Sequence, residues 1–203
     1  MRNAPRWKQR IAGKSLPMEK FAVKKTERYF AQRKFLVLPA IELLYVWNMF
    51  KVLGKKWSLS DPMLKLIKDA EKCLDDGLCA TAEYAADNRA LVLLLKGALL
   101  SATGNYIQAE EPLKQVIALE RKLKDDHYLV PYAIVELASI AFRNGDNGKA
   151  LSLIDNARKN YTGYSLESRL HFQMHSLAME VTEGRRSNDS QKAKADFDMT
   201  THL

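Results

Sequence analysis

The chain has 203 residues, of which 47% are hydrophobic and 28% charged, and its formal net charge is +8. This length can bury one sizeable core or support several stacked units, and the composition is ordinary for a globular protein. No run reaches 18 apolar residues and no signal-peptide core follows Met1, which excludes an evident membrane-spanning or secretory segment. Cys73 and Cys79 are too few for a disulfide framework and predict thiols of a reduced, cytoplasmic protein.

The positive charge is concentrated in the N-terminal third. Residues 1–60 hold 14 Lys and Arg against three acidic residues, whereas residues 61–183 hold 14 against 18. A basic segment is expected over residues 1–16, followed by a helix with a basic face. That face consists of Lys24, Lys25, Arg28, Arg33 and Lys34. Such a face is usually solvated, but it could also bind an anionic membrane surface. No RNA-binding aromatic signature accompanies it, so no nucleic-acid partner is expected.

Three helices are predicted between the N-terminal segment and the middle of the chain. The first begins near Met18, and the second spans residues 40–53. Ser60-Asp61-Pro62 predicts the start of the third, because a capping side chain precedes a proline of the first turn. Residues 78–86 are predicted to form a loop, and Asp87 is predicted to cap the helix after it.

One helix–turn–helix pattern occurs twice, at about residues 90–123 and 131–164. Each copy has a small residue within its first helix, a glycine at the turn and an alanine in its second helix. These residues are Gly97, Gly104 and Ala109 in the first copy and Ala138, Gly145 and Ala150 in the second. The copies are offset by 41 residues, which is typical of a helical solenoid. Gly97 in mid-helix indicates a close approach by the partner helix.

The fold expected is therefore all-α: a right-handed α-solenoid of stacked antiparallel helix pairs over residues 17–183. A last helix through about Thr182 would seal the end of the stack. Residues 184–203 are polar with little apolar content, and they are predicted to form a disordered tail.

Such a stack leaves a concave groove lined by the first helix of each pair. The residues predicted to line it are Arg89, Val92, Lys96, Leu100, Val135, Ser139 and Arg143. Lys96 and Arg143 would favour an acidic ligand or a C-terminal carboxylate. The predicted function is a non-catalytic interaction scaffold for a protein or peptide partner. The alternative is a peripheral membrane or lipid-associated protein that uses its basic N-terminal third.

No set of side chains predicts catalysis, a cofactor or a metal. His171 and His175 are four residues apart, but no third ligand is evident, so they are interpreted as a helix-surface pair. Asp125-Asp126-His127 precedes the second repeat, where it could orient a partner or anchor the helix that follows. No Ser/His/Asp or Cys/His set has motif support. The chain is therefore not expected to be an enzyme.

The paired pattern resembles the tetratricopeptide repeat, which prefers a small residue, Gly and Ala at its eighth, fifteenth and twentieth positions. The fourth-position Trp of that repeat is replaced by Leu93 and Ile134, and its closing Pro is absent from both copies. Four segments resemble the C-terminal part of the tetratricopeptide repeat protein 39 family: IAGKSLPMEKF (11–21), LPAIELLYVWN (38–48), DHYLVPYA (126–133) and NYTGYSLESR (160–169). The resemblance covers about residues 7–180 and implies an intracellular protein-interaction role with no catalytic residues. Members of that family extend further at the N-terminus, so the chain resembles a short form or a fragment.

Overall fold

The computed structural model describes residues 10–11, 14–77 and 81–200, and the side chains of residues 16–77 and 81–184. Helices dominate, beside one antiparallel ladder in which Arg10 lies opposite Ser15. The ladder joins β1 (Arg10–Ile11) to β2 (Lys14–Ser15). The helices are α1 (Pro17–Ala31), α2 (Pro39–Val46), α3 (Phe50–Leu53), α4 (Trp57–Asp75), α5 (Ala85–Ala102), α6 (Tyr106–Ala118), α7 (Leu129–Arg143), α8 (Asn147–Asn160) and α9 (Glu167–Thr200). Two short 3₁₀ turns, η2 (Ala82–Tyr84) and η3 (Glu120–Lys122), lie between helices.

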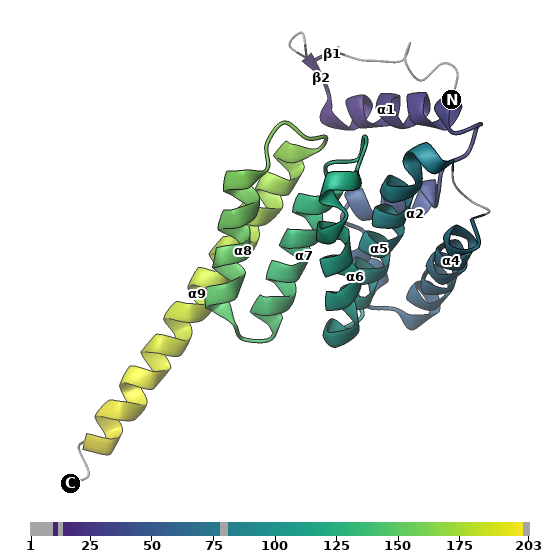
Figure 1. Ribbon diagram of the computed structural model, residues 1–203. Helices are drawn as coiled ribbons and strands as arrows, with labels where there is room; N and C mark the ends of the chain where they lie inside the picture. Colours follow the sequence, from purple (N-terminus) through teal and green to yellow (C-terminus); the bar gives the residue numbers. More distant parts are fainter. Residues whose placement is uncertain (1–9, 12–13, 78–80, 201–203) are drawn as a thin grey trace.

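The helices stack as antiparallel pairs (Figure 1). α5 pairs with α6 and α7 pairs with α8, while α7 also lies against both α5 and α6. On one side of these pairs, α2 and α3 contact α5, and α4 packs on α5 as well. On the other side, α9 contacts both α7 and α8. The predicted all-α solenoid of helix pairs is therefore confirmed.

The core lies along α5 and α7, because each of these helices is surrounded by others. Leu91 to Leu95 on α5 are at most 2% exposed, although consecutive residues of a helix point in all directions. α5 buries every face because α2, α3, α4, α6 and α7 all pack against it. A helix that is apolar all round requires such an enclosed position.

Because Gly97 has no side chain, α5 and α6 can approach each other closely. A methyl group at Gly97 would lie 2.6 Å from Cγ of Leu113 and 3.1 Å from the carbonyl oxygen of Ala109. The turns that end α5 and α7 also require glycine. Gly104 and Gly145 both have φ of +83°, a conformation that side chains disfavour.

α1 lies across one end of the stack (Figure 1) and is attached there by buried charges. Asp126 accepts hydrogen bonds from Lys25 Nζ at 2.8 Å and from Arg28. Lys25 Nζ also lies 2.6 Å from a carboxylate oxygen of Glu42 on α2. The Arg28 guanidinium donates to the side-chain oxygen of Asn88 on α5, 2.6 Å away. Two cations predicted for a solvated or membrane-facing surface therefore belong to the interior.

Asp87 completes this charge cluster, which consists of Lys25, Arg28, Glu42, Asp87 and Asp126. The prediction that Asp87 caps α5 is wrong, because α5 begins two residues earlier at Ala85. The Asp87 carboxylate instead accepts three backbone N–H groups, of residues 124 to 126, at 2.8 to 2.9 Å. Burial raises the pKa of Asp87, but these donors and Arg28 outweigh it, and the net pKa is lowered. Of Asp125-Asp126-His127, the Asp126 side chain attaches α1, and it does not cap the helix that follows, because α7 begins at Leu129 without a side-chain cap.

Two predicted helix boundaries also differ. The helix expected over residues 40–53 is interrupted at Asn48, whose φ of +62° is a left-handed conformation that asparagine tolerates. α4 begins at Trp57 and contains Pro62. The Ser60 hydroxyl donates to the carbonyls of Lys56 and Trp57, so this serine stabilises an earlier first turn.

Two other features differ from expectation. α9 continues to Thr200, where a disordered tail was expected from residue 184, and residues 201–203 lie outside the described part. No Gly or Pro interrupts residues 185–200, so helical backbone remains available even though this polar stretch extends away from the stack (Figure 1). Cys73 is disulfide-bonded rather than a free thiol, and Cys79 lies outside the described residues.

Removing the Asp126 carboxylate should loosen the attachment of α1. We expect Asp126→Ala to lower the free energy of unfolding by about 3 kcal/mol, because the buried Lys25 and Arg28 lose their shared partner. Asp125→Ala is the matched control, since that side chain is exposed. Urea titration followed by circular dichroism measures both variants, and equal stabilities would contradict a stabilising role for the cluster.

Gly97→Ala tests the contact between α5 and α6. Alanine favours a helix over glycine by about 1 kcal/mol, but the clash with Leu113 should reverse the sign and cost about 1–3 kcal/mol. Gly148→Ala in α8 is the control, because its new methyl group would only approach an Asp146 oxygen at 3.8 Å. We expect thermal unfolding to show opposite shifts for the two variants.

Candidate functional site

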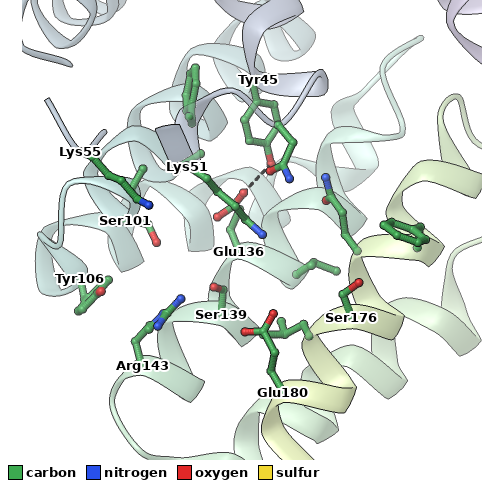
Figure 2. A pocket seen from close by; sticks show the side chains of 18 residues that line it. Tyr45, Lys51, Lys55, Ser101, Tyr106, Glu136, Ser139, Arg143, Ser176 and Glu180 are labelled. Carbon is green, nitrogen blue, oxygen red and sulfur yellow. Dashed lines mark hydrogen bonds between the residues drawn. The ribbon is translucent and has the colours of Figure 1, made fainter. Parts of the chain in front are cut away.

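The concave side of the stack contains a hollow of about 470 Å³. Its walls come from α2 and α3, α5, α7 and α9, with Tyr106 of α6 at its edge (Figure 2). The labelled residues of its lining are Tyr45, Lys51, Lys55, Ser101, Tyr106, Glu136, Ser139, Arg143, Ser176 and Glu180. Segments more than 120 residues apart in the sequence are thus combined in one concave surface.

Three of the residues predicted to line a groove do line this hollow: Val135, Ser139 and Arg143 of α7. The other four, all on α5, do not. Arg89 forms an ion pair with Asp75, and Lys96 lies 2.6 Å from Glu71.

Both of these acidic partners belong to α4, which covers that side of α5. Val92 and Leu100 are buried, at 0% and 6% exposure. The face of α5 assigned to a partner is therefore occupied by the chain's own α4.

The residues of α5 that do line the hollow could have been predicted from the 41-residue offset between the two repeats. Val135, Ser139 and Arg143 correspond, 41 positions earlier, to Leu94, Ala98 and Ala102. Ala98 and Ala102 line the hollow, as does Ser101 beside them. The residues predicted on α5 are out of register, by this offset, with those predicted on α7. No comparable repeat signal marks the lining residues of α2, α3 and α9.

A hydrogen-bonded acid lies at the floor of the hollow. The Tyr45 hydroxyl donates to Glu136 Oε1 at 3.0 Å, as the dashed line in Figure 2 shows. Burial raises the pKa of Glu136 to about 7, although the Tyr45 hydrogen bond and the charge of Lys51 act in the opposite direction. Near neutral pH this carboxyl group is therefore partly protonated.

Positive charge exceeds negative charge around this acid. Lys51, Lys55 and Arg143 line the hollow, whereas its other acidic residue is Glu180. All three cations are exposed to solvent. Phe172 of α9 also lines the hollow and is 72% exposed, which leaves an aromatic ring available at the edge. The hollow can therefore receive an acidic group and an apolar side chain together.

The lining of the hollow includes neither histidine nor cysteine. Among the described residues, no group of three His, Cys, Asp or Glu side chains could hold a metal ion. His171, one of the two histidines considered above, lies 3.7 Å from Glu167 on the exposed surface of α9.

Glu136→Gln should change how stability depends on pH. The folded-state pKa of Glu136 is about 7, above the ordinary glutamate value of 4.5, so the folded wild-type chain binds more protons between these values. Wild-type stability should therefore fall as pH rises from 4.5 to 7, relative to Glu136→Gln. Thermal unfolding at several pH values measures the difference. Parallel pH profiles would show that Glu136 titrates normally.

Comparison with known proteins places this structure in a family. Residues 1–103 match the Iml2/Tetratricopeptide repeat protein 39 family model. Over 169 residues the chain is 35% identical to "Tetratricopeptide repeat protein ttc-39B" of Caenorhabditis elegans, a match that covers 82% of this chain and 28% of that relative. The chain thus spans less than a third of the length of this relative, and no solved structure matches it. The chain belongs to the Iml2/Tetratricopeptide repeat protein 39 family.

Proposed function

We propose that this chain is a non-catalytic scaffold whose hollow holds a short segment of a partner protein. The observation that carries this proposal is a concave surface built by four separate parts of the solenoid. Stacked helix pairs generally use such surfaces to bind other chains. The family name, with its tetratricopeptide repeat, supports the same general role. A cytoplasmic location stays a prediction of the sequence.

The charge of the hollow favours an acidic partner segment. Lys51, Lys55 and Arg143 all contribute to the same lining, and Glu136 is only partly ionised near neutral pH. An Arg side chain can form two parallel hydrogen bonds with a carboxylate, which makes Arg143 the best placed residue to orient such a group. An apolar side chain of the same segment would pack against Phe172. The ligand class is therefore a short peptide that combines an acidic group with an apolar anchor.

The alternative, a membrane-binding face on α1, has less support. Two of the five residues assigned to that face, Lys25 and Arg28, are buried and paired with acidic residues. Lys24, Arg33 and Lys34 remain exposed. Because two of these five cations are unavailable to a membrane, we base the proposed function on the hollow. Among the described helices, none is sufficiently long and apolar to cross a membrane.

Arg143→Glu tests the proposed function. Short peptides selected from a display library on the wild-type chain should be rich in Asp or Glu. Their affinity for Arg143→Glu should fall by about tenfold or more, because an attractive charge becomes repulsive. Arg121→Glu is the matched control, since Arg121 is exposed in η3 and does not line the hollow. Isothermal titration calorimetry gives the affinities.

The pH dependence provides a second readout of the same peptides. Affinity should decrease as pH rises through about 7, because Glu136 then carries a full negative charge in the hollow. Selected peptides that bind the Arg143→Glu and wild-type chains equally would refute the hollow as their binding site.

A further inference from the structure

The chain has a second surface that the hollow does not use. Thirteen large hydrophobic side chains are exposed in the described part of the chain, and six of them lie within residues 43–59. These six are Leu43, Trp47, Met49, Val52, Trp57 and Leu59. Trp57 is 69% exposed and Val52 61% exposed. None of the six lines the hollow, and we call this stretch of exposed apolar side chains the α2–α4 corner.

Helix geometry directs these side chains away from the core. α2 and α3 pack on α5, with Ile41, Tyr45 and Phe50 buried. Successive residues of an α-helix are rotated by about 100°, so a residue two positions along lies on nearly the opposite side. Leu43 and Trp47 are each two positions beyond Ile41 and Tyr45, and Val52 is two beyond Phe50. α2 and α3 therefore form a layer with one side on the core and the hollow and the other side on solvent.

The same stretch also carries positive charge. Residues 43–60 contain Lys51, Lys55 and Lys56, all exposed, and no Asp or Glu. Lys51 and Lys55 line the hollow, so Lys56 is the lysine of this stretch that belongs to the corner alone. The Arg169 guanidinium adds to the charge of the corner, because it lies 5.8 Å from the centre of the Trp47 ring. Exposed apolar side chains thus share this corner with Lys56 and Arg169.

We propose that the α2–α4 corner docks on the surface of a membrane that contains anionic lipids. Tryptophan rings favour the headgroup region of a bilayer, where one part of the ring is apolar and the N–H is polar. The shorter apolar side chains reach the acyl boundary, as they do in interfacial helices. Each lysine near such a surface contributes attraction to anionic headgroups, and its long stem covers apolar surface while the ammonium stays hydrated.

Lysine distinguishes a membrane surface from a protein partner at this corner. Tryptophan, methionine and arginine are enriched at protein interfaces, but lysine is depleted from them, whereas it is favourable at membrane surfaces. Of the side chains of the corner, Trp47 and Val52 lie on the opposite side of α2 and α3 from Tyr45 and Phe50, which line the hollow. Docking through these outer side chains would leave the hollow open, and a partner segment could be held beside the bilayer.

Co-sedimentation with lipid vesicles tests the membrane surface directly. The full chain is incubated with vesicles of phosphatidylcholine alone or of phosphatidylcholine mixed with phosphatidylserine. We expect sedimentation only with the phosphatidylserine vesicles, and it should weaken as salt screens the lysines. The double variant Val52→Ser/Trp57→Ser should reduce binding by about tenfold, because the side chains that enter the boundary are removed. Lys56→Glu should reduce it to a similar extent.

Ile107→Ser is the matched control, since Ile107 on α6 is 90% exposed and lies outside the corner. It should bind vesicles like the wild type, as should Arg143→Glu. All the substituted residues are exposed, and circular dichroism confirms that each variant is folded.

Absence of sedimentation, equal binding to both vesicle types, or full binding by the double variant would overturn the proposal. Self-association that the double variant abolishes, without vesicle binding, would assign the corner to a protein contact instead. Because Arg143→Glu affects only the hollow, failure of one proposal is distinguishable from failure of the other.

Discussion

The sharing of the buried Asp126 carboxylate between Lys25 and Arg28 is the constraint on which the N-terminal half of the molecule depends. It attaches α1 to the segment that leads into α7, across about 100 residues of sequence. Burying charges in this way contributes little net stability compared with apolar packing, but an unpaired charge there would be very unfavourable. The cluster therefore favours the observed position of α1, in which both cations are paired.

The same cluster determines where one wall of the hollow stands. Glu42 on α2 forms an ion pair with Lys25 and also accepts a hydrogen bond from the Tyr128 hydroxyl. The Tyr128 ring packs edge-on against Tyr132, and Tyr132 in turn against Tyr45, with ring centres 5.6 and 5.9 Å apart. This aromatic series places the Tyr45 hydroxyl against Glu136. The contact between Lys25 and Glu42, which lies outside the hollow, thus helps to position Tyr45 against Glu136 at the floor of the hollow.

The sequence predicts the repeats well and their surroundings poorly, for a physical reason. Gly104 and Gly145 report a local backbone requirement, so their 41-residue spacing is visible in the chain itself. The partner of a charged residue depends on tertiary contact, and Lys25 gives no local sign that it meets Asp126. The face of α5 that holds Arg89 shows the same limit. The repeat position of Arg89 predicts a place in the groove, whereas α4 supplies its partner Asp75, which only the packing of α4 on α5 reveals.

The layer formed by α2 and α3 connects the two proposed surfaces. Tyr45 and Phe50 face the hollow, while Trp47 and Val52 face solvent on the other side of the same short helices. A rigid shift of this layer would change both surfaces together, because few residues separate them. Arg169 opposes such a shift, since its Nε donates to the carbonyl of Val46 at 3.1 Å and joins α2 to α9. A membrane contact at the corner would therefore act on the hollow through this hydrogen bond, which already joins α2 and α9, two walls of the hollow.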